Sequence, residues 1–265
     1  MITTNLIKMA TELNNPVQYF LVTEDRRIFM NEYIGKRVRL KYLHKINCIK
    51  CGRLTKTSFA QGYCYPCFIS VPETEECVLR PELCRAHEGI ARDMDYATSH
   101  CLIKHFVYLA LSGGIKVGVT RHTQIPERWI DQGAVQAVKV AETPNRYIAG
   151  TIEVALKNIF SDKTNWRDML SNRNKPDADL EEEKSKALKY LHPDFKKYAV
   201  YDNTITNIHY PVLHYPLKVK NINFDNMDSI EDTLTGIKGQ YLIFESGAVL
   251  NIRRHNGYLV EIDVD

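Results

Sequence analysis

Paired cysteines are the residues of this 265-residue sequence whose types and spacing point most directly to chemistry. Cys48 and Cys51 are followed, after twelve residues, by Cys64 and Cys67, in the pattern C-x2-C-x12-C-x2-C. Two thiolates three residues apart fit one edge of a tetrahedron at about 2.3 Å from Zn²⁺. Gly52 permits the tight turn after the second thiolate. The pattern predicts a structural zinc site of the zinc-ribbon kind, the alternative being unrelated thiols.

The other three cysteines favour a second metal site. The candidate ligands, which form a Cys3His shell, are Cys77, Cys84, His87 and Cys101. His100 and His105 are rival ligands, and the alternative is a set of buried free thiols. Since the sequence opens without a recognisable secretory signal, we expect a reducing, cytoplasmic location, no disulfides and no disulfide-linked partner.

A basic stretch surrounds the first cysteine set. Residues 33–72 contain no Asp or Glu, and aromatic residues are interleaved with the cations. The candidate nucleic-acid contacts here are Arg37, Arg39, Lys41, Lys50, Arg53 and Lys56. Cations together with aromatic faces can hold phosphates and stack bases, so DNA or RNA is the expected partner. The alternative is solvated basic side chains on strands beside core aromatics.

Residues 106–166 place further polar side chains on regular elements. We expect strands at 106–111 and 115–120 around a Gly-Gly turn, a helix entered at Pro126, a strand at 135–140 and a helix over 147–160. The polar residues of interest on or near these elements are Tyr108, Arg121, Arg128, Glu153 and Asn165.

This order resembles the core of the GIY-YIG nucleases. The resemblance is carried by Tyr108 on an apolar strand, Lys116-Val117-Gly118-x-Thr120, Pro126-x-Arg128 and Glu153 on a helix. It implies a Mg²⁺- or Mn²⁺-dependent phosphodiesterase. The implied catalytic residues are Tyr108 assisting deprotonation of water, Arg128 on the scissile phosphate, Glu153 holding the cation and Asn165 supporting the site, with Arg121 as a spare phosphate contact. The sequence departs from the family where Lys116 replaces the second-motif tyrosine.

The chain as a whole resembles an uncharacterised bacterial family known only as a domain of unknown function. That resemblance is carried by the Cys48–Cys67 segment, the run Leu79–His87 and the segment Gly236–Asn251. It implies no activity.

The elements that must position these residues predict an α+β fold. We expect a β-rich segment at 1–45, a zinc-binding segment at 46–105, a small α/β core at 106–170, a polar helical linker at 171–197 and a β-rich segment at 198–265. The two end segments share the order Gln-Tyr, strand, polar turn, strand ending in Asn. We interpret them as two meanders that could close into one barrel, the alternative being chance similarity of two hairpins.

Composition excludes several classes of protein. Apolar residues make up 44% and charged residues 25%, with a formal net charge of +3, so disorder and collagen-like repeats are excluded. The longest apolar run is too short for a transmembrane helix, and no Walker loop or G-x-G-x-x-G is present. Two hypotheses remain: a zinc-containing nuclease, or a non-catalytic nucleic-acid or ribonucleoprotein binding module with a decayed nuclease-like core. A protein-interaction scaffold is a weaker third.

Overall fold

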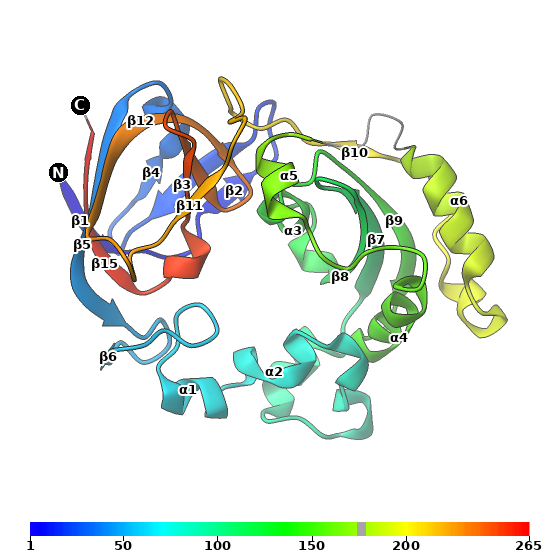
Figure 1. Ribbon diagram of the computed structural model, residues 1–265. Helices are drawn as coiled ribbons and strands as arrows, with labels where there is room; N and C mark the ends of the chain where they lie inside the picture. Colours follow the sequence, from blue (N-terminus) through cyan, green and yellow to red (C-terminus); the bar gives the residue numbers. More distant parts are fainter. Residues whose placement is uncertain (174–178, 265) are drawn as a thin grey trace. The chain divides into compact units, whose positions relative to one another are not determined.

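The computed structural model describes residues 1–173 and 179–264, and the chain divides into two compact units (Figure 1). The first unit combines Met1–Ile69 with Ile208–Asp265, and the second is Ser70–Asn207. The predicted α+β fold class is confirmed, since strands in several sheets are accompanied by short helices.

The first unit is built on an eight-stranded sheet with the order β1-β15-β5-β12-β13-β14-β11 and β6 paired to β5. Its strands are β1 (Ile2–Asn5), β5 (Arg37–Asn47), β6 (Leu54–Thr55), β11 (Lys220–Ile222), β12 (Ser229–Lys238), β13 (Tyr241–Phe244), β14 (Ala248–Asn251) and β15 (Tyr258–Val264). In β5 the residues alternate between exposed cations and buried Val38, Leu40 and Tyr42, which is the period of a strand with one face on the core. The two chain ends meet where Ile2 pairs with Ile262 (Figure 1).

The predicted shared barrel is wrong. β3 (Gln18–Val22) and β4 (Arg27–Phe29) form a separate three-stranded sheet with β2 (Ala10–Glu12). β5, the strand that follows this hairpin, pairs with the C-terminal strands β12 and β15 on its two edges, so it has no edge left for β4. In the described part of the chain the eight-stranded order is open, with β1 and β11 at its ends.

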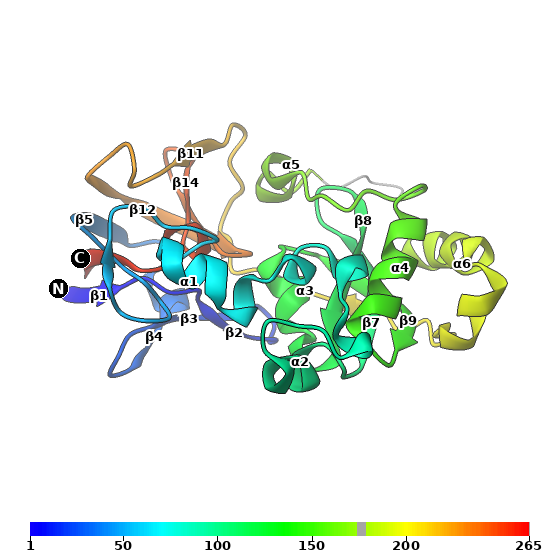
Figure 2. The same ribbon diagram turned by 90° about the horizontal axis from the view of Figure 1, so that it is seen from below.

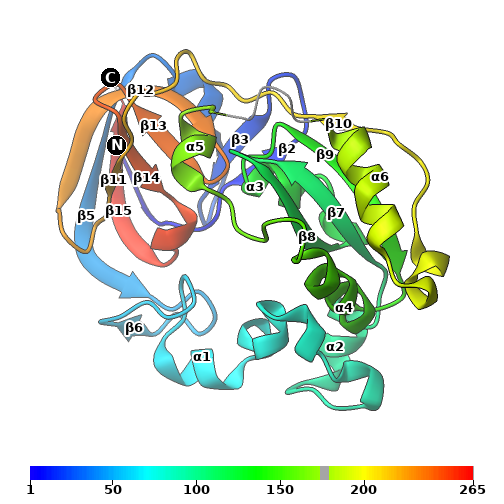
Figure 3. The same cartoon turned by 45° about the vertical axis from the view of Figure 1, so that its right-hand side comes forward.

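The second unit contains a four-stranded sheet with the order β10-β9-β7-β8 (Figure 3). Its strands are β7 (His105–Leu111), β8 (Ile115–Arg121), β9 (Gln136–Thr143) and β10 (Thr206–Asn207). β7 pairs antiparallel with both β8 and β9. These strands, α3 (Glu127–Asp131) and α4 (Arg146–Leu156) confirm the elements predicted between residues 106 and 160.

Two helices cover one face of this sheet. α4 and α6 (Leu180–Tyr190) bury apolar side chains against the strand residues that point to their side, including Val107, Leu109 and Val138. α6 lies beside β9 (Figures 2 and 3). Asp179 caps its start, because the Asp179 carboxylate accepts from two backbone amides of the first turn. Part of the predicted linker, residues 174–178, lies outside the described residues.

The remaining helices are α1 (Tyr65–Ser70), α2 (Met94–His100) and α5 (Trp166–Leu170). Short 3₁₀ turns fill the stretch between α1 and α2. Among the residues described, no helix has both the length and the apolar character needed to cross a membrane.

Candidate functional site

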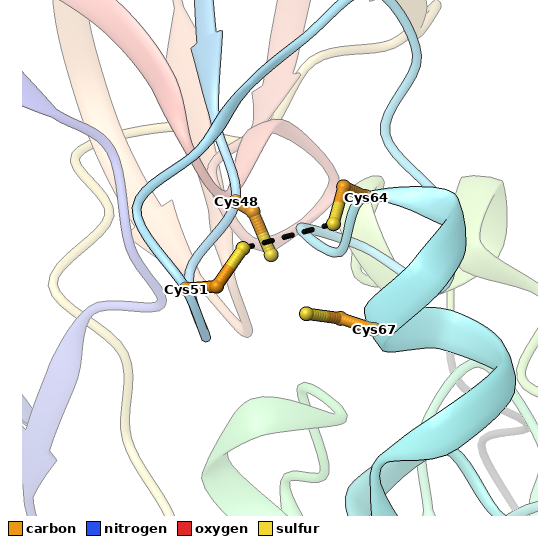
Figure 4. A group of neighbouring side chains, drawn as sticks. All are labelled: Cys48, Cys51, Cys64 and Cys67. Carbon is orange, nitrogen blue, oxygen red and sulfur yellow. Dashed lines mark hydrogen bonds between the residues drawn. The ribbon is translucent and has the colours of Figure 1, made fainter.

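The first cysteine cluster (Cys48, Cys51, Cys64 and Cys67) comes from a turn after β5 and from the start of α1 (Figure 4). All four sulfur atoms lie within 4.8 Å of one another, and Cys51 Sγ is 3.7 Å from Cys64 Sγ. Gly52, at φ +70°, donates its N–H to the Cys48 carbonyl at 2.8 Å and closes the turn. Four soft sulfur donors at this separation are a set that zinc accepts, so the cluster could hold zinc.

Backbone N–H groups favour the thiolate form of Cys48 in this cluster. Although burial acts in the opposite direction, hydrogen bonds from the backbone N–H groups of Cys64, Cys51 and Lys50 lower the pKa of Cys48 to about 6. Neighbouring hydrogen bonds fix the second half of the loop: Ile49 N–H donates to the Gly62 carbonyl at 2.9 Å. A thiol that loses its proton near neutral pH is a ready metal ligand.

The second cysteine cluster (Cys77, Cys84 and Cys101) lies in the 3₁₀ turns before α2 and at the end of α2. Its sulfur atoms also lie within 4.8 Å of one another, and all three residues are buried. Arg146 Nη1 donates to Cys77 Sγ at 3.3 Å. Hydrogen bonds from the thiols of Cys101 and Cys84, together with this guanidinium, lower the pKa of Cys77 far below its usual range. This cluster could also hold zinc.

The predicted histidine ligands lie apart from the three thiols. His87 does not join the group; its ring stacks on Tyr147 with the centroids 4.4 Å apart. His100 Nδ1 contacts the Tyr96 carbonyl at 3.1 Å. His105 Nδ1 contacts the Ile103 carbonyl at 2.8 Å, and burial lowers the pKa of His105 to about 4.

The basic residues of β5 are paired with acids from other strands. Arg37 Nε lies 2.9 Å from Glu231 Oε1 on β12. Arg39 stands opposite Glu231 on one side and Asp263 on the other. Opposite charges facing each other across strands compensate within the sheet. Residues 33–72 contain no acid, but at β5 the acids of β12 and β15 lie beside the basic side chains.

Lys41, the next basic residue of β5 that the sequence predicts as a contact, also faces an acid. Lys41 Nζ lies 3.9 Å from Glu261 Oε2 on β15. The exposed cations of the zinc-loop surface, which surround the first cysteine cluster, are Lys50, Arg53 and Lys56. Arg121, the last residue of β8, lies opposite His105 and at the far end of the strand from Lys116.

The centre of β7 brings together two of the predicted catalytic residues. Tyr108 is fully buried and faces Gly118 on β8 so closely that a Cβ at that glycine would lie 2.6 Å from the Tyr108 Oη. The hydroxyl donates to Gln132 Oε1 at 2.8 Å, and the ring meets Trp129 edge-on at 6.0 Å. Burial raises the pKa of Tyr108, and the nearby Arg128 guanidinium opposes that rise.

Lys116 and Glu153 complete what we call the core polar group (Tyr108, Lys116, Arg128 and Glu153). Burial, assisted by the charge of Arg128 and opposed by those of Glu153 and Asp162, lowers the pKa of Lys116 to about 8. Lys116 Nζ donates to Thr164 Oγ1 at 3.2 Å. Burial raises the pKa of Glu153, whose Oε2 lies 3.6 Å from Lys157 Nζ. The group therefore mixes a guanidinium, a proton acceptor near neutral pH and a carboxylate.

Asn165 has a different position. It caps α5, with its Oδ1 accepting from Asp168 N–H at 3.4 Å and its Nδ2 donating to Asp168 Oδ2 at 2.5 Å. Sequence reasoning treated Lys116 only as a departure from a motif and missed Arg146 and Gln132. Alternation along β8 could have found Lys116, because it shares a strand face with Gly118. Nothing local to Arg146 signals its contact with Cys77, which lies 69 positions earlier.

The comparisons with known proteins identify a family without an activity. A family model described as "Protein of unknown function (DUF2797)" matches residues 35–260, and the chain belongs to this family. No curated protein matches the chain, and no solved structure does.

Proposed function

We propose that this member of the DUF2797 family is a zinc-containing, divalent-cation-dependent phosphodiesterase that acts on nucleic acid. The observation that supports the proposal most is the core polar group. Tyr108, Arg128 and Glu153 come from β7, α3 and α4, yet Arg128 and Glu153 both act on the ionisation of Tyr108 and of Lys116. A guanidinium, a carboxylate and a proton acceptor are side chains that can support phosphodiester hydrolysis.

Arg128 would bind the phosphate, and Glu153 would bind the divalent cation. A guanidinium matches two phosphate oxygens and the charge that develops on them during hydrolysis. Glu153 is 8% exposed and lies within electrostatic reach of Lys157, Asp162 and Glu82. A carboxylate with water and phosphate oxygens is a donor set that Mg²⁺ accepts. A bound cation would neutralise phosphate charge and make water more acidic.

Lys116 would accept the proton from water, whereas Tyr108 would keep its own proton. With its pKa near 8, Lys116 is partly neutral at neutral pH and can accept a proton from water. Tyr108 keeps its proton, because burial raises its pKa and its hydroxyl donates to Gln132. We therefore assign Tyr108 to orientation of the site, and Lys116 to the proton transfer that the resemblance gave to the tyrosine. Cleavage should then rise with pH up to about 8.

The first cysteine cluster would give the first unit a nucleic-acid-binding surface of its own. Zinc bound by the four thiolates would hold the loop that carries Lys50, Arg53 and Lys56, the zinc-loop surface. Phe59 stacks on Phe68 at 5.7 Å in the same segment. Cations beside aromatic rings suit a phosphate backbone with unstacked bases.

A binding module without catalysis is the second candidate. It is favoured by the complete burial of Tyr108 and by its hydrogen bond to Gln132, since a catalytic tyrosine must reach a reacting water. In that case Arg128 and the zinc-loop surface would bind phosphate, and Glu153 would serve only as the ion-pair partner of Lys157.

A cleavage assay separates the two candidates. Labelled duplex, branched and single-stranded DNA and structured RNA are incubated with the full-length protein in Mg²⁺, Mn²⁺ or chelator. We expect cation-dependent cleavage that Glu153→Gln abolishes and Lys116→Met reduces by at least about a hundredfold. Glu142→Gln is the matched control, because Glu142 lies on neighbouring β9 in a surface pair with Lys104 and should leave the rate unchanged. Binding without cleavage in every protein would refute the phosphodiesterase and favour the binding module.

A further inference from the structure

The second cysteine cluster brings three thiols together, and the described part of the chain adds no fourth side-chain ligand to them. Cys77, Cys84 and Cys101 are 6%, 3% and 2% exposed, and none of them forms a disulfide. Within residues 1–173 and 179–264, no further Cys, His, Asp or Glu offers a ligand atom to this group. Three converging buried thiols are a donor set for a thiophilic cation rather than for an oxidised pair.

The apolar core around the cluster is small. The local core consists of the three cysteines, Ala86 and Ala97, with Ala91 and Met94 packed against it. These side chains are small and bury little apolar area, whereas the stretch they hold is a series of short 3₁₀ turns. A metal ion bound by residues from separate turns stabilises a fold that lacks a sufficient apolar core.

Guanidinium groups offset the negative charge of the thiolates in this cluster. Three thiolates with a divalent cation leave one excess negative charge, and Arg146 supplies one positive charge. Its Nη1 is 3.3 Å from Cys77 Sγ, its Nη2 is 3.3 Å from the His100 carbonyl, and the residue is 8% exposed. Arg121 is a second guanidinium that acts on Cys101. Cations beside the sulfur atoms stabilise thiolate ligands in a buried site.

The predicted histidine ligand, His87, does not join the three thiols. The His87 ring stacks on Tyr147, and its Nε2 lies 3.8 Å from Glu88 Oε1. Both contacts engage the ring outside the group of three sulfur atoms.

We infer that Cys77, Cys84 and Cys101 bind one thiophilic divalent cation, Zn²⁺ by class, through three thiolates, and that the fourth position takes water or another small exchangeable ligand. Arg146 acts as the charge partner of this three-thiolate centre. Three protein ligands with one open position is the arrangement of zinc sites that bind or activate small molecules, whereas the first cysteine cluster has the closed set of a structural site. The inference does not depend on the proposed phosphodiesterase.

Cobalt substitution of the full-length protein tests the ligand set. Co²⁺ reports its ligands through visible absorption, and we expect two equivalents per chain. Cys51→Ser removes the first centre and leaves the second; in that background His87→Ala should keep the remaining equivalent with an unchanged spectrum. Added azide or imidazole should shift the bands of this centre. In Cys77→Ser, which retains only the four-thiolate centre, the same ligands should change nothing.

Three results would overturn the inference. These are loss of the second cobalt equivalent in His87→Ala, bands that do not respond to azide or imidazole, and a wild-type protein that binds only one equivalent.

Arg146 is tested by affinity rather than by stoichiometry. Competition with a chelator in the Cys51→Ser background should show metal affinity reduced by about 10- to 100-fold in Arg146→Met, because outer partners of metal ligands contribute that much. Arg146→Lys keeps the charge and should restore most of the loss, which also separates charge from a failure to fold. Equal affinity in all three proteins would refute the role of Arg146.

Discussion

Replacing Lys116 by methionine should make the second unit more stable while it removes the proposed proton acceptor. Lys116 is 6% exposed on β8, and burial lowers the pKa of its ammonium group from 10.5 to about 8. The folded protein therefore holds a charge that would be better solvated in the unfolded chain. Methionine has a similar length and carries no charge, so it can fill the same space.

The pKa shift of Lys116 gives the size of the expected gain in the free energy of unfolding. Each pKa unit is worth about 1.4 kcal/mol, so the buried charge costs about 3 kcal/mol at pH 7. Loss of the hydrogen bond to Thr164 offsets about 1 kcal/mol of the gain. The net expectation is a variant about 2 kcal/mol more stable than the wild type at pH 7.

The sign of the pH dependence follows from proton linkage. Between about pH 8 and 10.5 the unfolded chain keeps a proton on Lys116 that the folded chain has lost, so wild-type stability rises with pH across this window. The charge penalty removed by the substitution should shrink from about 3 kcal/mol at pH 7 to about half of that near pH 9.5.

Urea unfolding followed by tryptophan fluorescence measures this effect. The two tryptophans, Trp129 and Trp166, both lie in the second unit, so the signal reports that unit. Lys104→Met is the control, because its side chain is 63% exposed beside Glu142 and its removal should change stability by less than about 0.5 kcal/mol. A Lys116→Met protein less stable than the wild type at pH 7, or a difference that does not vary with pH, would refute the reasoning.

Three further predictions concern packing, acid stability and nucleic-acid binding. Gly118→Ala should lower the free energy of unfolding by about 1–3 kcal/mol in a urea titration, because its Cβ would lie 2.6 Å from a buried tyrosine hydroxyl. Gly114→Ala has open space at its Cβ and should be near neutral, and equal losses of stability in the two variants would contradict this packing. Burial lowers the pKa of His105 to about 4, so wild-type stability should fall as the pH drops from 6.5 to about 4. His105→Leu should remove that part of the pH dependence, and a variant with the same acid stability profile as the wild type would contradict the prediction. If the protein binds nucleic acid, Arg53→Ala should weaken binding and reduce its salt dependence in a filter-binding titration, whereas Arg37→Ala, paired with an acid on β12, should do so less; the reverse order would point to the β5 face.

The sequence alone determined the local elements and the local cysteine pattern. The strands with alternating or continuous apolar residues and the Gly-Gly turn of the β7–β8 hairpin depend on neighbouring residues, and the structure confirms them. The first cysteine cluster could be predicted for the same reason, because its two Cys-x2-Cys pairs already hold each pair of sulfur atoms close together.

Tertiary structure decided everything that depends on contacts between distant segments. Strand pairing opposed the basic residues of β5 with acids near the other end of the chain, so charge counted along the sequence overstated the charge of the surface. Packing placed Arg146, rather than a histidine, beside the second cysteine cluster, and burial moved the pKa of Lys116 toward neutrality. Desolvation and cross-strand electrostatics depend on which atoms surround a side chain in space, and a single sequence does not specify those neighbours.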